Sequence, residues 1–299
     1  MSVQVLEGEQ SIKGMDLDEA REMAWHADLP FVYADMVENQ NIAPEDAEAA
    51  IISAAAQQGL DLTIVNVQDS QAFIALDSAS DQVTLAFAPG STSKNMQFWT
   101  TEHFFGGNVF QGARSAFMVE DENGFFADQV RGALGDAIDR QDGAPVDLNI
   151  VGMSKGGAIA IDAFAQWDSE GFFTGHPNVI VNALYTFGSP PVGNAEFCEN
   201  FDARAQEMGM EVWRLTGQGD DIVPDLFTED APWYGRPMFT EDLVHVGTQI
   251  DLPAVDGHSM EAYIEALHSP QGLDSMVVGD GAVANFPEQP PPMPPSFSP

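Results

Sequence analysis

Residues 146–161 read VDLNIVGMSKGGAIAI and hold the most informative local pattern of this chain. The apolar run 146–151 predicts a buried strand, and the Ala- and Ile-rich run from 156 predicts a helix. Between them, residues 152–156 fit the pattern G-x-S-x-G, which places Ser154 in a sharp turn between strand and helix. Such a turn exposes a serine hydroxyl for nucleophilic attack, although a Gly-rich turn with an incidental serine remains the alternative.

Strand and helix patterns alternate on both sides of this turn. We expect helices at 16–37, 44–58, 126–138, 156–167, 195–208 and 261–267, strands at 62–67, 72–76, 83–88, 146–151, 179–187 and 211–215, and an irregular stretch at 90–112. This alternation predicts an α/β fold with a mostly parallel central sheet and helices on both faces.

The chain has 299 residues, which suits one large domain. We expect a single domain over residues 1–285, with N-terminal helices in 16–58 and a core in 61–268. Seven of the residues 287–299 are proline, so 286–299 should form an extended tail.

The charge balance excludes some functions. Lys and Arg total 10 against 47 Asp and Glu, a formal net charge of −37. Nucleic-acid binding requires a basic patch, and an anionic membrane surface would repel this chain. The 44% hydrophobic content supports a soluble globular core, and no apolar run is long enough to predict a transmembrane helix. The acidity fits either a protein adapted to high salt or an ordinary acidic protein.

Cofactor and compartment signals are sparse. Cys198 is the single cysteine, so we expect no intrachain disulfide, and we find no motif for a metal or another cofactor. The first residues show no apolar leader, which predicts a cytoplasmic location and leaves export without a signal open.

A serine nucleophile needs a base, and the base needs an orienting acid. Candidate bases after Ser154 are His176, His245, His258 and His268, and candidate acids include Asp220, Asp221, Asp225 and Asp256. His245 falls in a strand-like pattern over 243–247, which favours a structural role, and His268 ends a predicted helix. Periodicity does not choose among these residues.

Several segments within residues 61–267 form a series of motifs. In chain order they are the loop 86–91 (AFAPGS), the segment 109–112 (VFQG), the elbow at 149–158, the segment 186–194 (TFGSPPVGN), the loop 221–224 (DIVP), the strand 245–247 (HVG) and the segment 257–263 (GHSMEAY). They resemble, in the same order, the motifs of the class 3 lipase family, in which 86–91 corresponds to the oxyanion loop, 221–224 to the acid loop and 257–263 to the histidine segment. The resemblance implies an α/β-hydrolase fold.

The same resemblance implies roles for individual residues. Ser154 would be the nucleophile, His258 the general base and acid, and Asp221 the orienting carboxylate. The backbone N–H groups of Ser91 and Lys155 would form the oxyanion hole. The implied reaction is hydrolysis of carboxylic esters, lipid-like or acylglycerol esters among them, through an acyl-serine intermediate.

The sequence departs from the family pattern near the predicted site. Met153 and Lys155 occupy positions where the family usually has His and Leu. An elbow with lysine after the serine resembles that of bacterial relatives. The Lys155 ammonium would either favour an anionic head group or lie solvated, with only its N–H in use. The other departures are Pro89, Pro191, Phe110 and Ala113.

Two alternatives remain open at this level. The fold could serve as a silent binding module, or the same triad could cleave thioesters. The aromatic residues of 98–105 would form either a lid, with transient contact to lipid surfaces, or ordinary core.

Overall fold

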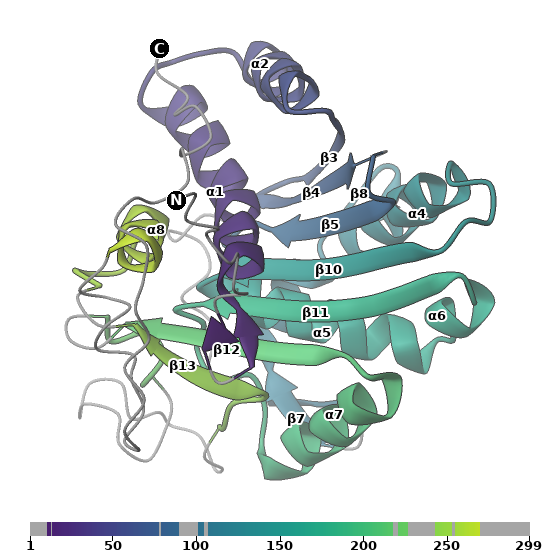
Figure 1. The fold of residues 1–299 in the computed structure, drawn as a ribbon, viewed down its shortest axis with the longest axis vertical. Coiled ribbons are helices and arrows are strands. Elements are labelled where there is room, and N and C mark those ends of the chain that lie inside the picture. The colour runs from purple at the N-terminus through teal and green to yellow at the C-terminus, as the bar shows by residue number, and fades with distance from the viewer. Residues whose placement is uncertain are drawn as a thin grey trace, which may run out of the picture.

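A seven-stranded sheet organises the chain (Figure 1). The computed structural model describes residues 11–12, 14–77, 79–89, 101–104, 107–217, 221–226, 243–252 and 255–269. The strand order is β13-β12-β11-β10-β5-β4-β3, with all neighbours from β13 to β5 parallel and β3, β4 and β5 joined antiparallel. The strands are β3 (Leu60–Val67), β4 (Ser70–Asp77), β5 (Gln82–Phe87), β10 (Val146–Met153), β11 (Val179–Phe187), β12 (Glu211–Gly217) and β13 (Thr248–Leu252).

Helices cover both faces of this sheet, as the sequence predicts. One hydrophobic cluster joins the sheet to α1 (Leu17–Glu38), α2 (Pro44–Gln57) and α8 (Met260–His268). A second cluster joins its other face to α3 (Gln111–Phe117), α4 (Phe126–Asp139), α5 (Lys155–Ser169), α6 (Phe172–Gly175) and α7 (Ala195–Met208). The mostly parallel α/β architecture with helices on both faces is therefore confirmed.

Local sequence signals explain where the N-terminal helices begin. The Asp16 carboxylate accepts hydrogen bonds from the backbone N–H groups of Asp18 and Glu19, at 2.8 and 3.0 Å, and so caps α1. Pro44 opens α2, where the missing N–H costs no helical hydrogen bond. Both helices lie within the predicted range 16–58.

Two predictions about irregular and extended segments need correction. The stretch 90–112, predicted to be irregular, contains a hairpin of β6 (Thr101–Phe104) and β7 (Gly107–Phe110), and α3 begins at Gln111. The strand-like pattern 243–247 is not a strand: only Val244 forms a bridge, to Gly193, and the strand begins at Thr248. Gly247 has φ +74°, which breaks the extended conformation just before β13.

Two short hairpins complete the described structure. The first pairs β1 (Ser11–Ile12) with β2 (Met15–Asp16), and the second pairs β8 (Glu120–Asp121) with β9 (Gly124–Phe125). Each strand has only two residues, which is too short for sequence periodicity to reveal. The predicted tail 286–299 and the aromatic residues Phe98, Trp99 and Phe105 lie outside the described residues.

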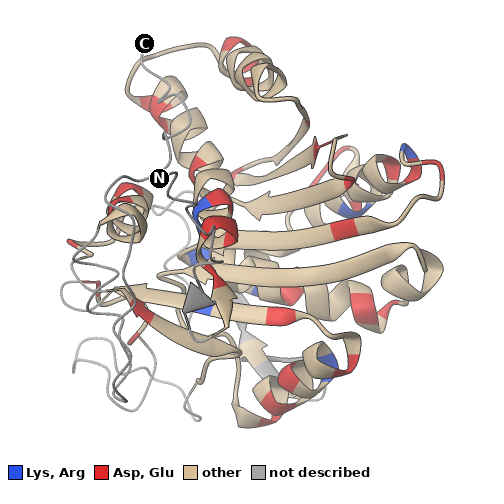
Figure 2. Cartoon of the chain, viewed as in Figure 1, with Lys and Arg blue, Asp and Glu red and all other residues tan. Residues whose placement is uncertain are grey.

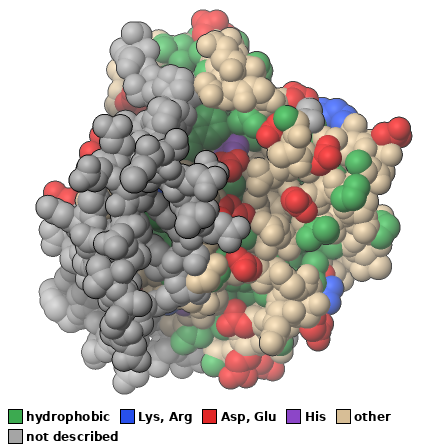
Figure 3. All heavy atoms as spheres, in the orientation of Figure 1, with side chains coloured by type: hydrophobic (Ala, Val, Ile, Leu, Met, Phe, Trp, Pro, Cys, Tyr) green, Lys and Arg blue, Asp and Glu red, His purple; other side chains and the backbone are tan. Residues whose placement is uncertain are grey.

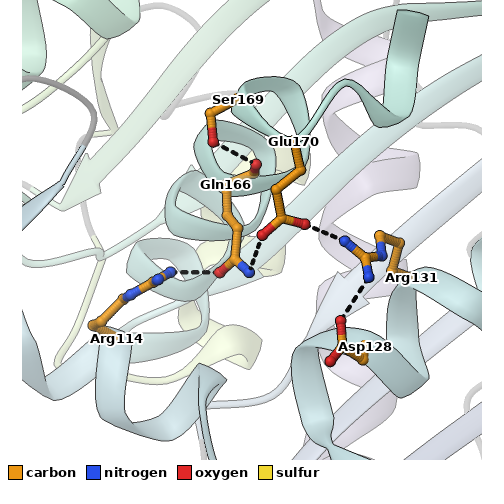
Figure 4. Close-up of polar contacts among 6 residues, drawn as sticks. All are labelled: Arg114, Asp128, Arg131, Gln166, Ser169 and Glu170. Carbon is orange, nitrogen blue, oxygen red and sulfur yellow. Dashed lines mark hydrogen bonds and ion pairs between the residues drawn. The ribbon is translucent and has the colours of Figure 1, made fainter. Parts of the chain in front are cut away.

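A network of hydrogen bonds and ion pairs links α3, α4 and α5 on one face of the sheet (Figure 4). Gln166 of α5 accepts a hydrogen bond from Arg114 of α3 and donates to Glu170 at 2.7 Å. Glu170 also binds Arg131 of α4, which binds Asp128 at 2.7 Å. Arginine, with several donors on a rigid plane, can link two acids in this way.

Acidic side chains dominate the described surface. Figure 2 shows Asp and Glu spread over helices and strands, with few Lys and Arg, and Figure 3 shows the same imbalance on one face of the molecule. In the described ranges no helix is both long and apolar enough to cross a bilayer. The same ranges contain no group of His, Cys, Asp and Glu arranged to hold a metal ion.

Candidate active site

The candidate nucleophile occupies a strained turn at the carboxyl end of β10. Ser154 has φ +56° and ψ −131°, a backbone conformation that residues with a Cβ rarely adopt. Its N–H donates to the Phe187 carbonyl at 2.8 Å, which fixes the turn against β11. A Cβ added to Gly156 would lie 2.3 Å from the Phe87 carbonyl, so a glycine there lets α5 pack directly on β5. The strand–turn–helix elbow predicted from the sequence is confirmed.

Asp221 and His258 lie in direct contact, although 37 residues separate them. His258 Nδ1 is 3.0 Å from each carboxylate oxygen of Asp221. The Asp221 side chain is fully buried, whereas 29% of the His258 side chain is exposed. Because Asp221 engages Nδ1, Nε2 is the ring nitrogen left for proton transfer.

Two further groups hold the Asp221 carboxylate in place. Tyr263 of α8 donates its hydroxyl proton to Oδ2 at 2.6 Å, and the Val223 N–H donates to Oδ1 at 3.0 Å. Burial opposes ionisation, but the hydrogen bonds from His258, Tyr263 and Val223 outweigh it and hold the pKa of Asp221 below its ordinary value. The acid is therefore kept charged, as an orienting carboxylate requires.

Tyr263 itself is anchored at a strand end. Its hydroxyl accepts the Gly217 N–H at 3.1 Å, so one oxygen links β12, α8 and Asp221. Burial and the nearby Asp221 charge raise the pKa of the tyrosine and keep it protonated. The sequence segment 257–263 contains this tyrosine without revealing its role. A buried tyrosine needs a partner for its hydroxyl, but only the fold shows which one.

Gly188 connects the nucleophile turn to the Asp221–His258 pair. It follows Phe187, whose carbonyl binds Ser154, and has φ +54°. A Cβ at this position would lie 2.7 Å from Asp221 Oδ2 and 3.1 Å from His258 Cε1. At the end of β11, Phe187 therefore contacts the Ser154 turn, and the next residue, Gly188, contacts Asp221 and His258.

Gly188→Ala should disrupt this arrangement. We expect hydrolysis to fall at least about tenfold and the protein to lose about 2 kcal/mol of stability, because the new methyl group collides with the Asp221 carboxylate. Gly143→Ala is the matched control: Gly143 also has positive φ, at +80°, but nothing lies within 4 Å of its added Cβ. Equal losses of activity in the two variants would show that strain, and not the collision, matters.

The remaining candidates occupy other positions. His245 Nε2 donates to the Pro224 carbonyl at 2.7 Å, and burial and Arg214 lower its pKa to about 4. His176 and His268 contact carbonyls of their own helices through Nδ1. Asp225 and Asp256 are exposed, and Asp220 lies outside the described residues. Among the four candidate bases, His258 is the one the structure pairs with a candidate acid.

Of the two predicted oxyanion-hole residues, the structure describes Lys155 but not Ser91. Lys155 is the first residue of α5, directly after Ser154, so its N–H lies at the helix start where negative charge is favoured. Its side chain is partly buried and not fully solvated. Ser91 falls outside the described residues.

The comparison with known families agrees with this geometry. The family described as lipase (class 3) matches residues 78–231, more than half of the 299-residue chain. The chain belongs to this family and is a carboxylic ester hydrolase. No curated protein sequence matches it.

Solved structures support the fold independently. A mutant form of MDLA from Penicillium cyclopium has 21% identity and a TM-score of 0.54, with 79% of each chain covered. The lipase from Rhizopus microsporus var. chinensis has 19% identity and a TM-score of 0.52, with 79% of this chain and 74% of that chain covered. Rhizomucor miehei lipase in complex with its propeptide has 16% identity and a TM-score of 0.53, covering 89% and 84%. These likenesses show a shared α/β-hydrolase architecture.

Proposed function

We propose that this chain cleaves lipid-like carboxylic esters with a triad of Ser154, His258 and Asp221. The observation that carries the proposal is the contact between the buried, ionised Asp221 and His258 Nδ1. This pair lies at the end of β11, the strand whose Phe187 carbonyl binds the Ser154 turn. Family membership supplies the reaction class, ester hydrolysis. Solved structures with a similar fold are described as lipases, which motivates the lipid-like acyl group.

In the proposed reaction these residues act as follows. His258 Nε2 takes the proton of the Ser154 hydroxyl as its Oγ bonds to the ester carbonyl carbon. The tetrahedral oxyanion is stabilised by backbone N–H groups, with Lys155 as one donor and Ser91 as the other. The alkoxide leaves with the proton from His258, and the acyl group stays on Ser154. Water then attacks, gives its proton to His258, and the carboxylic acid departs as Ser154 regains a proton.

Hydrolysis of p-nitrophenyl esters from acetate to palmitate tests this function. We expect release of p-nitrophenol, with the preferred chain length separating a lipase from a short-chain esterase, and a matched thioester measures the competing leaving group. The assay is run at low and molar NaCl because of the −37 charge. Covalent labelling of Ser154 by a fluorophosphonate checks the nucleophile directly. Folded protein with neither turnover nor labelling would show a silent fold.

Tyr263→Phe tests the positioning of the acid. Loss of the Tyr263 hydroxyl removes one hydrogen bond that lowers the pKa of Asp221, so that pKa should rise. Activity requires the charged carboxylate, so the fractional loss of kcat should grow as the pH falls towards the raised pKa of Asp221. We expect kcat to fall about tenfold, because the acid also loses an anchor. A uniform loss at every pH would contradict this role.

A further inference from the structure

Lys155 brings a cationic side chain to the residue directly after the proposed nucleophile. It is the one lysine in the described ranges and follows Ser154 directly. Burial lowers the pKa of its ammonium to about 8, and the Asp69 carboxylate acts in the opposite direction. A partly buried ammonium is costly unless a negative group compensates it, so its neighbours decide its role.

Asp69, whose charge acts on Lys155, belongs to another part of the fold. It lies, exposed, in the turn between β3 and β4. The Ala88 N–H donates to the Gln71 carbonyl at 3.0 Å, which ties the start of β4 to the chain just beyond β5. The start of α5 packs on the same end of β5 through Gly156. Lys155 and Asp69 therefore belong to one edge, where the chain leaves β5 towards the proposed oxyanion loop.

The described arginines have other partners. Side chains of Asp, Glu or Gln bind each of them: Arg21 to Asp18, Arg114 to Gln166, Arg131 to Asp128 and Glu170, Arg140 to Asp61, Arg204 to Asp168 and Glu207, and Arg214 to Gln249. In a chain of net charge −37, a negatively charged substrate is repelled overall. Lys155 is the described cation adjoining Ser154, so it can reverse this repulsion locally.

We propose that Lys155 makes this hydrolase prefer esters that carry a negative charge, a carboxylate or a phosphate, near the scissile carbonyl. The proposal rests on the proposed function and names a substrate class for the same site. The ammonium attracts the substrate anion, while the Asp69 carboxylate competes for the same positive charge. Ion pairs at a partly buried site are stronger than at an open surface because solvent screens them less.

Two pairs of synthetic esters test the proposal. Mono-p-nitrophenyl glutarate against p-nitrophenyl valerate places the charge on the acyl group. In the second pair, 4-butyryloxybenzoate against 4-butyryloxybenzamide places it on the leaving alcohol. The measured quantity is the ratio of kcat/KM for the charged ester to that for the neutral ester, at low salt, in each pair.

The variants should change this ratio in opposite directions. Lys155→Met removes the charge and keeps much of the side-chain length, so the ratio should fall about tenfold in at least one pair. Lys155→Arg keeps the charge and should retain most of the preference. Asp69→Asn, an exposed change, should raise the ratio about threefold because a competing anion is gone. Molar NaCl should reduce all these differences.

Clear outcomes overturn the proposal. Unchanged ratios in Lys155→Met for both pairs, with the neutral esters still cleaved, would refute the role of Lys155 and leave the proposed hydrolase function intact. If Lys155→Met does not fold, an unchanged ratio in Asp69→Asn refutes it equally. Absence of hydrolysis of all four esters by the unmodified protein would instead refute the proposed function, and this inference with it.

Discussion

Replacing Ser154 with alanine is expected to lower ester hydrolysis by about four to six powers of ten. The alanine keeps the Cβ and the strained turn but has no oxygen to form the acyl intermediate, and the remaining triad groups cannot substitute for it. The measurement is kcat/KM for the best p-nitrophenyl ester, together with loss of fluorophosphonate labelling. Ser169→Ala, at the far end of the same helix α5, is the control and should retain activity.

A glycine at the same position separates chemistry from stability. Ser154 has φ +56°, where glycine is tolerated without a Cβ penalty. Ser154→Gly should therefore be inactive yet more stable than the unmodified protein, by about 1 kcal/mol. Thermal denaturation of Ser154→Gly and of the unmodified protein tests this difference. Residual hydrolysis by Ser154→Ala at a tenth of the original rate would identify another nucleophile.

Asp221→Asn is expected to lower kcat by about three to four powers of ten. Both carboxylate oxygens accept hydrogen bonds: Oδ1 from the Val223 N–H, Oδ2 from the Tyr263 hydroxyl, and both lie 3.0 Å from His258 Nδ1. An asparagine has one NH2 group, and in either orientation that group faces a donor. The amide also removes the negative charge that stabilises the imidazolium and selects its tautomer.

The same change should lower stability by about 1–3 kcal/mol, because a buried donor is left facing another donor. Asp225→Asn is the matched control, since Asp225 is an exposed carboxylate in the same loop and was an alternative acid by sequence. It should keep both activity and stability. Full activity in Asp221→Asn would mean that another residue orients the base. The measurements are kcat over a range of pH and urea denaturation of each variant.

Several features of the fold could be predicted because they depend on local sequence. The strand 146–151 and the helix after it are recognisable from an apolar run, glycines and a serine, and the structure places β10 and α5 there. Hairpin β6–β7 and the start of β13 were missed because their periodicity is short or interrupted. The pattern at 243–247 alternates like a strand, yet the positive φ of Gly247 stops it.

The site shows a different limit. The order of residues left four histidines and several acids as candidates, and the resemblance to a family favoured His258 and Asp221. In the structure His258 and Asp221 are in contact although they are 37 positions apart in the chain. His245 instead donates from Nε2 to the Pro224 carbonyl. The role of Tyr263 emerged only here, because its two partners lie 42 and 46 residues away in the chain.

The sequence by itself determined the α/β class, the elbow at Ser154 and the strongly acidic character, because each depends on neighbouring residues or on composition. Tertiary structure alone decided which acid meets which histidine, what holds that acid charged, and which carboxylate influences the charge of Lys155. These are contacts between distant segments at the carboxyl ends of parallel strands. Sheet register and helix packing bring those ends together, and neither can be read from local spacing.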